Sequence, residues 1–400
     1  MVRYSDSHQP KVLILYASYG EGHLQAAKAI RDALEEQGND RIVMVDLMAE
    51  SHPWLNEMTR RVYMKSYTHI PHLYGWVYDV TRPMKHNSLF GGFLHSFGRD
   101  KIRKLLQKEQ PDAVIHTFPF FALPALHRRQ RRLTRKLHPQ ASIPTYTVIT
   151  DFDLHRRWVH PGIGRYFVAT EDMKQELGSL GIPPGRVSVS GIPLGRGFRS
   201  SMAPSFELYE KYGLSPEQPV ILLMPGAQGV MPDCDELCRL LLEQLPDAQI
   251  ALVCGRNSLL KSSMADQFEQ HAAADRLHLF GYVDQVHELM ALATCLVSKP
   301  GGVTLAEAIC AGLPLFLYKP VPGQEKNNAR YLQSKGAASI AYNAHGMAAA
   351  IMRLMNDPEQ LQRSRMAVQR LQTEEAAADS IAHHILQECG WNAKFGQRYS

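Results

Sequence analysis

The sequence lacks a long hydrophobic run. No segment reaches the roughly 18 consecutive apolar residues that a membrane-spanning helix needs. The longest candidate, residues 113–126, is interrupted by a histidine, a threonine and two prolines. The apolar run near the N-terminus is short and leads into a glycine-containing turn, so we interpret it as a strand and not as a signal peptide. The sequence therefore predicts a cytoplasmic protein without a transmembrane helix.

Cysteine is scarce. The 400 residues include six cysteines, and all of them lie in the second half of the chain. Cys234 and Cys238 have helical spacing and not the spacing of a CxxC metal-binding motif. Several of the others fall in apolar strand or helix patterns. We therefore expect buried free thiols in a reducing compartment.

The common nucleotide-binding motifs are missing or incomplete. No G-x(4)-G-K-[ST] motif occurs, which excludes P-loop chemistry. The loop 19–23, YGEGH, begins like a dinucleotide-binding fingerprint, and Asp46 is placed like its ribose-binding acid. The third glycine position, however, is Gln25. The incomplete match gives little support for NAD binding.

Acidic residues are absent between Asp112 and Asp151, whereas residues 127–138 include six arginines and lysines. The first 200 residues carry a net charge of +10 and the last 200 one of −5. Each cation near an anionic leaflet contributes about 1 kcal/mol. We expect this segment to face anionic membrane lipids; the alternative is a solvated basic helix, and no nucleic-acid-binding module accompanies it. The predicted membrane-face residues are Arg128, Arg129, Arg131, Arg132, Arg135 and Lys136.

Two segments of the first half, 54–78 and 88–98, are apolar and aromatic without strand alternation. They are consistent with a lipid-contacting lobe beside the basic segment. An ordinary pair of core helices explains them about equally well, so both interpretations stay open.

The rest of the chain alternates β-branched runs with amphipathic stretches, which is typical of βαβα units around parallel sheets. Residues 11–17 form the first predicted strand, and a glycine turn and a helix over 23–37 follow. The same order restarts at 219–224, after a loop-rich stretch at 191–205. This coarse duplication predicts two Rossmann-like domains.

His23 falls in the first turn of the first predicted helix, at the mouth of the sheet, where open α/β folds bind ligands. A histidine there can act as a general base. It can equally contact a phosphate or cap the helix.

Two motifs in the second half fit a nucleotide sugar. Residues 299–307, KPGGVTLAE, place paired glycines before a helix, where backbone amides can hold a diphosphate. Glu307 lies one turn further, where its carboxylate can accept hydrogen bonds from ribose hydroxyls; the alternative is a surface glutamate. Gln324 and Glu325 begin another helix and can bind a polyol, or simply cap that helix.

Together these motifs resemble glycosyltransferase family 28, and within it the monogalactosyldiacylglycerol synthases and bacterial processive diacylglycerol β-glucosyltransferases. The resemblance runs from Lys11 to about Leu386 and is strongest for the paired stretches 298–308 and 314–329. The stretch 150–160, TDFDLHRRWVH, indicates the diacylglycerol-using subgroup.

The resemblance implies a GT-B fold, in which two Rossmann-like domains face a central cleft. Residues 1–198 would form an acceptor- and membrane-binding domain, and residues 199–372 a UDP-sugar-binding domain. Residues 373–400 would form a C-terminal helix that packs back on the first domain.

The resemblance also implies roles for individual residues. His23 corresponds to the proposed catalytic base, in a loop where Glu21 replaces a family glycine. Gly22, Asp151 and His155 would lie on the acceptor side. The donor-binding residues would be Gln228, Gly229, Val283, Gly301, Gly302, Val303, Thr304, Glu307, Gln324 and Glu325.

The implied reaction is an inverting transfer of glucose, or alternatively galactose, from a UDP-sugar to diacylglycerol. The resemblance to the bacterial branch also implies processive addition of sugars to the glycosylated product. The enzyme would work at the cytoplasmic face of the membrane, peripherally bound, without cofactor or metal. A UDP-sugar epimerase of the same fold and a non-catalytic membrane-docking UDP-sugar sensor are the alternatives. The basic and aromatic first half argues against the epimerase. The presence of His23, Glu307 and Gln324 argues against the sensor.

Overall fold

The computed structural model describes residues 9–17, 21–47, 80, 99–119, 143–160, 162–199, 203–226 and 229–391. Some predictions lie outside these residues: the membrane-face residues 128–136, the aromatic segments 54–78 and 88–98, and Gln228. Within the described residues, no helix is both long and apolar enough to cross a membrane.

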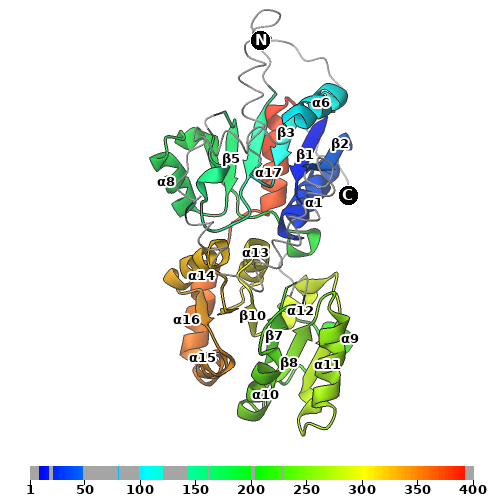
Figure 1. Cartoon of the computed structure of the whole chain (residues 1–400), viewed down its shortest axis with the longest axis vertical. Helices are drawn as coiled ribbons and strands as arrows, with labels where there is room; N and C mark the ends of the chain where they lie inside the picture. Colours follow the sequence, from blue (N-terminus) through cyan, green and yellow to red (C-terminus); the bar gives the residue numbers. More distant parts are fainter. Residues whose placement is uncertain are drawn as a thin grey trace, which may run out of the picture. The chain divides into compact units, whose positions relative to one another are not determined.

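The chain divides into two compact units (Figure 1). The first unit contains residues 1–196 and 373–400, and the second contains residues 197–372. Each is built on one six-stranded sheet whose strands are all parallel. The prediction of an α/β protein with two Rossmann-like domains is confirmed.

The sheet of the first unit has the strand order β2-β1-β3-β4-β5-β6. Its strands are β1 (Val12–Tyr16), β2 (Ile42–Asp46), β3 (Ala113–His116), β4 (Thr145–Val148), β5 (Arg165–Val168) and β6 (Val187–Val189). Four of the five residues of β1 are buried, as a continuous apolar run in a parallel sheet requires.

Helices cover both faces of this sheet. Helix α6 (Arg99–Glu109) packs on one face through Ile102 and Leu106. Helices α1 (Glu21–Glu36) and α17 (Ala377–Glu388) pack on the other. Helix α8 (Glu171–Ser179) and the short 3₁₀ helices η1 (Arg156–Trp158), η2 (Pro184–Arg186) and η3 (Arg196–Phe198) lie in the later connections; η3 reaches the boundary between the units.

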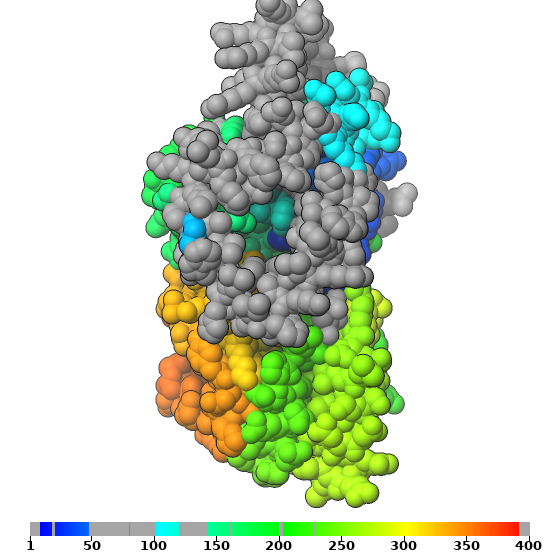
Figure 2. All heavy atoms as spheres, viewed as in Figure 1, coloured from blue at the N-terminus to red at the C-terminus, as the bar shows by residue number. Residues whose placement is uncertain are grey.

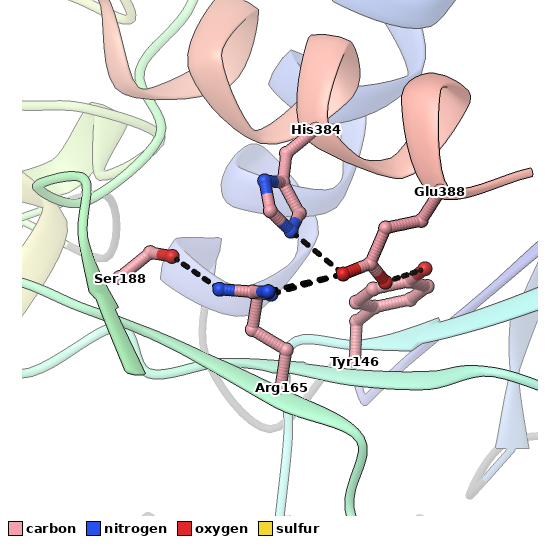
Figure 3. A network of polar contacts seen from close by, with 5 residues as sticks. All are labelled: Tyr146, Arg165, Ser188, His384 and Glu388. Atoms are coloured by element: carbon pink, nitrogen blue, oxygen red, sulfur yellow. Dashed lines mark hydrogen bonds and ion pairs between the residues drawn. The ribbon is translucent and has the colours of Figure 1, made fainter. Parts of the chain in front are cut away.

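Helix α17 lies beside α1 although the two are far apart in the sequence (Figure 1). A polar network fixes its end to the sheet (Figure 3). The Glu388 carboxylate accepts hydrogen bonds from the Tyr146 hydroxyl at 2.7 Å, Arg165 Nη2 at 3.1 Å and His384 Nε2 at 3.0 Å. Burial raises the pKa of Glu388, but the hydrogen bonds from Tyr146 and Arg165 outweigh it and leave that pKa below its usual value. The C-terminal helix is thus an integral part of the first unit.

The sheet of the second unit has the order β12-β11-β10-β7-β8-β9. Its strands are β7 (Val220–Met224), β8 (Gln249–Val253), β9 (Leu277–Phe280), β10 (Cys295–Ser298), β11 (Leu315–Tyr318) and β12 (Ala338–Ala341). Its helices are α9 (Phe206–Tyr212), α10 (Cys234–Gln244), α11 (Ser258–Phe268), α12 (Val286–Leu292), α13 (Gly302–Cys310), α14 (Gln324–Ser334), α15 (Ala344–Asn356) and α16 (Pro358–Gln369); the 3₁₀ helix η4 (Ala274–Arg276) precedes β9.

One face of this sheet shares a hydrophobic core with α10, α11 and α15. Figure 2 shows the outer side chains of α10 (green) between those of α15 (orange) and α11 (yellow-green). Arg276 fixes the end of α10, because its guanidinium donates to the carbonyl oxygens of Leu242, Leu245 and Ala248 at 2.6–2.9 Å. The Leu242 carbonyl is one of the last carbonyls of α10, which have no partner within the helix.

All six cysteines are free thiols, as the sequence predicts. Four are buried: Cys234, Cys238, Cys254 and Cys295. Cys310 is exposed and Cys389 is half-buried. The expectation of burial therefore fails for Cys310, because it is the last residue of α13 and faces away from the core.

Candidate active site

The sheet order of the first unit creates a switch point between β1 and β3. The chain leaves β1 toward β2 on one side, whereas β3 leads to β4 on the other. Open α/β sheets bind ligands at the carboxyl ends of the strands at such a point. His23 lies there, in the first turn of α1, together with Thr117 after β3 and Thr150 after β4.

The His23 side chain is fixed from several directions. Its Nδ1 lies 3.0 Å from the hydroxyl oxygen of Thr150. The ring contacts Phe118 edge-on at 5.1 Å between centroids and Trp158 at 6.3 Å. The Thr117 hydroxyl donates to the backbone carbonyl of His23 at 2.9 Å, which holds the helix start in place.

Burial lowers the pKa of His23 from 6.5 to about 4, against a smaller opposing effect of a hydrogen bond with the backbone of Thr117. Desolvation disfavours the charged imidazolium, which explains the direction. The imidazole is therefore neutral at neutral pH, and one ring nitrogen has a lone pair that can accept a proton.

A second histidine–threonine pair, His116 in β3 and Thr147 in β4, lies next to this arrangement. The backbone carbonyl of Phe118 can only accept, so His116 Nδ1 donates to it at 3.1 Å. In the neutral ring Nε2 then accepts from the Thr147 hydroxyl at 2.9 Å. His116 and Thr147 are buried, and they position Phe118 against His23.

The predicted acceptor-side residues Asp151 and His155 are both buried beside this site. His155 Nδ1 accepts from the backbone N–H of Arg157 at 3.1 Å and caps η1. That 3₁₀ helix carries Trp158, which contacts His23. The geometry thus gives His155 a structural role in placing Trp158.

The second unit has its own switch point, between β7 and β10. The Ser298 hydroxyl at the end of β10 donates to the Met224 carbonyl at the end of β7, at 2.8 Å. Gly226 and Gly229 in the next loop have left-handed backbones, with φ of 87° and 58°. Asn257 donates to the Gly229 carbonyl at 2.9 Å and fixes this loop to the neighbouring segment.

Helix α13 begins at the same edge. Gly301 is its N-cap residue and provides no side chain to cap it, so the amides of the first turn, Gly302, Val303 and Thr304, are available to an anion. Burial raises the pKa of Glu307 from 4.5 to about 8. A carboxyl group held in an apolar helix and largely protonated at neutral pH is typical of a ligand-binding position.

Helix α14 places Gln324 and Glu325 in its first turn, after Gly323 with φ of 101°. The Glu325 carboxylate accepts from the Val321 N–H at 3.2 Å. Asn328, one turn further, is fully buried and donates to the Pro300 carbonyl at 3.3 Å. This contact joins α14 to the loop before α13, so the predicted sugar and diphosphate positions are directly connected.

Two more features belong to the second unit. Val283 follows Tyr282, an exposed residue whose ring lies 4.9 Å from the Arg256 guanidinium. Burial lowers the pKa of Lys299, against the nearby negative charge of Glu325. Apart from Gln228, every predicted donor-binding residue is described, and all lie in the second unit.

Sequence reasoning missed the residues that support these sites. Thr117 and Thr150 each follow a strand. This position in the sequence is recognisable, but it does not distinguish them from other threonines. Asp233 is another: it ion-pairs with Lys319 and accepts from the Tyr318 hydroxyl at 2.8 Å. Asp233 and Lys319 both have positive φ, which the sequence gives no means of finding.

Comparison with known proteins identifies the family. Residues 23–194 match the family "Monogalactosyldiacylglycerol (MGDG) synthase", and residues 233–370 match "Glycosyl transferases group 1". The processive diacylglycerol β-glucosyltransferase of Bacillus cytotoxicus is 38% identical over 379 residues, which cover 95% of this chain and 94% of that protein. The protein of the same name from Bacillus thuringiensis is 37% identical over 379 residues. The chain belongs to this glycosyltransferase family.

Solved structures show that the fold of this glycosyltransferase is GT-B. The MurG of Acinetobacter baumannii superimposes with a TM-score of 0.62 at 15% identity, over 94% of this chain and 99% of that one. The S. aureus MnaA–UDP co-structure gives a TM-score of 0.59 at 14% identity, over 98% of this chain and 100% of that one.

A structure described as a putative UDP-N-acetylglucosamine 2-epimerase from Listeria monocytogenes gives a TM-score of 0.61 at 15% identity, over 98% of this chain and 100% of that one. The fold alone therefore does not separate a transferase from an epimerase. The 38% sequence identity to a glucosyltransferase over 95% of this chain does separate them, and it removes the epimerase alternative.

Proposed function

We propose that this glycosyltransferase transfers glucose from UDP-glucose to the free hydroxyl of diacylglycerol with inversion at the anomeric carbon. The observation that carries the proposal is His23. It is a neutral imidazole at the switch point of the first unit, held by Thr150, Phe118 and Trp158. The names of the relatives support the choice of glucose and diacylglycerol.

In the proposed step, His23 Nε2 accepts the proton of the acceptor hydroxyl while that oxygen attacks the anomeric carbon. The bond between this carbon and the UDP oxygen breaks, and UDP leaves with the electron pair. The negative charge that develops on UDP favours the imidazolium as it forms, which offsets the low pKa of the free histidine. A single displacement of this kind converts an α-linked donor into a β-linked product.

The donor would bind to the second unit. We propose that the amides at the start of α13 hold the diphosphate, helped by the helix dipole. Gln228 and Gly229 would line the phosphates, Val283 would contact the uracil, Glu307 would accept from the ribose hydroxyls, and Gln324 and Glu325 would contact the sugar. The step needs no metal ion, so we expect turnover to persist in EDTA.

We also propose that the enzyme adds a second glucose to its own product, because the relatives are named as processive. It would dock on anionic lipids through residues 128–136. Replacing Arg128, Arg129, Arg131 and Arg132 by alanine should weaken binding to anionic vesicles, at about 1 kcal/mol for each cation. Unchanged vesicle binding would contradict this docking surface.

The test of the catalytic proposal is His23→Ala. Calorimetry should show unchanged UDP binding, because the proposed UDP ligands belong to the second unit, while glucosyl transfer falls by about 10²- to 10⁴-fold, as expected for loss of a general base. His345→Ala removes a histidine whose side chain is 73% exposed and is the matched control. Turnover by His23→Ala at the rate of this control would remove His23 from the role.

A further inference from the structure

The Thr150 hydroxyl bears directly on how His23 can act as a base. A neutral imidazole has one N–H and one lone pair, and the hydrogen bond at one nitrogen decides which of the two the other nitrogen has. The contact of Thr150 is with Nδ1, at 3.0 Å. If the hydroxyl accepts, the lone pair is on Nε2; if it donates, Nε2 has the proton and cannot remove another.

We propose that Thr150 is a positioning residue whose hydroxyl oxygen accepts the Nδ1–H of His23 and so keeps the lone pair on Nε2, toward the acceptor. The inference rests on the proposed function, because only a base needs that lone pair. The hydroxyl thus does for His23 what a carboxylate does in many histidine-containing catalytic sites.

The surroundings of Thr150 suit this role. Thr150 is only 3% exposed. It lies two positions beyond the end of β4, the strand that pairs with β3. A β-branched side chain in such a place has little freedom about χ1, so its hydroxyl stays directed at the ring. Phe118 and Trp158 fix the plane of the same ring, which leaves the tautomer as the remaining variable.

The charge of the site agrees with a neutral orienting group. Burial is the dominant influence on the pKa of His23, which it lowers; the smaller opposing effect comes from a hydrogen bond with the Thr117 backbone and not from a carboxylate of the described residues. A hydroxyl fixes the tautomer without stabilising the imidazolium before substrate arrives. The base is therefore kept neutral in the resting enzyme.

The experiment compares four full-length variants with the wild type by NMR of ¹⁵N-labelled histidine, with His23→Ala to identify the signal. Thr150→Val removes the hydroxyl at constant shape, and Thr150→Ser keeps it. Thr145→Val is the matched control, because Thr145 is equally buried and its hydroxyl contacts the Ile143 carbonyl at the opposite end of β4. Activity is measured in parallel.

We expect the Nδ1–H form of His23 in the wild type, Thr150→Ser and Thr145→Val, and a shift toward the Nε2–H form in Thr150→Val. The kcat of Thr150→Val should fall by about 2- to 10-fold, the range that one neutral hydrogen bond gives, at unchanged KM for UDP-glucose. An Nε2–H form in the wild type would overturn the proposal. So would a Thr150→Val variant with the wild-type tautomer and kcat.

The two proposals fail separately. The tautomer is read in the enzyme without substrate, so it decides on Thr150 even if no glucosyl transfer to diacylglycerol is found. If Thr150→Val does not fold, Thr150→Ala removes the same hydroxyl without adding a methyl group and is read in the same way.

Discussion

The loop after β7 permits a sharp test of the donor site, through replacement of Gly229 by alanine. The backbone of Gly229 has φ of 58°, a left-handed conformation that costs an L-residue about 1–2 kcal/mol. An added Cβ would also lie 2.2 Å from the Cys254 carbonyl oxygen and 2.5 Å from Asn257 Cβ. Relief of these contacts requires a shift of about 1 Å.

The two costs can be separated with Gly213→Ala. Gly213 has φ of 63° at the end of α9, and an added Cβ would have nothing within 4 Å. The free energy of unfolding of this control should fall only by the backbone contribution, about 1–2 kcal/mol. For Gly229→Ala the free energy of unfolding should fall by a further 1–3 kcal/mol or so because of overpacking. The total loss of stability is then about 2–5 kcal/mol.

Denaturant unfolding gives the free energies, and calorimetry gives the UDP affinity. We expect Gly229→Ala to bind UDP on the order of 10-fold more weakly, because its loop is displaced, and Gly213→Ala to bind it as the wild type does. If the two variants are equally stable and bind UDP equally well, both the tight packing of Gly229 and its place in the donor site are wrong.

Three other predictions concern charged groups. Arg276→Ala should lower the free energy of unfolding by about 2–3 kcal/mol in denaturant experiments, because the carbonyls of Leu242, Leu245 and Ala248 lose a charged donor; a loss below about 0.5 kcal/mol would contradict this. Glu388→Gln should destabilise the first unit at pH 7, and because the folded pKa of Glu388 is depressed below 4.5, the wild type should keep this advantage above that value and lose it as the pH falls through the lower folded pKa; a difference in unfolding free energy between wild type and variant that stays constant down to about pH 3 would refute it. For Glu307, whose pKa burial raises to about 8, the ribose hydroxyls require the ionised form, so uridine affinity by calorimetry should rise about 50-fold from pH 6 to 8, as the ionised fraction does; Glu307→Gln should abolish the dependence, and a flat wild-type profile would contradict the assignment.

The strongly apolar strands and the glycine loops after them were predictable from the sequence. The strand predicted over 219–224 is β7, Val220–Met224, and the helix predicted over 23–37 is α1, Glu21–Glu36. In both cases a continuous buried run and a turn signal define the element locally. The helix predicted near 231–244 begins only at Cys234, because Asp233 adopts a left-handed conformation.

Other features could not be predicted because they depend on strand order. Strand β12, Ala338–Ala341, consists of small residues and a single isoleucine, so its pattern is weak. Thr117 and Thr150 meet His23 only because β1, β3 and β4 are neighbours in the sheet. The sequence marks the stretch 150–160 as typical of the subgroup, but only the structure shows that Thr150 contacts His23 while His155 caps η1.

The most direct test of the central claim is analysis of the lipid products after incubation of the purified enzyme with diacylglycerol-containing anionic vesicles and UDP-glucose or UDP-galactose. We predict β-linked mono- and diglucosyl diacylglycerol from UDP-glucose and little product from UDP-galactose. An α-linked product would contradict the single displacement with His23 as base. The absence of glycolipid from either donor would contradict the assignment of diacylglycerol as acceptor.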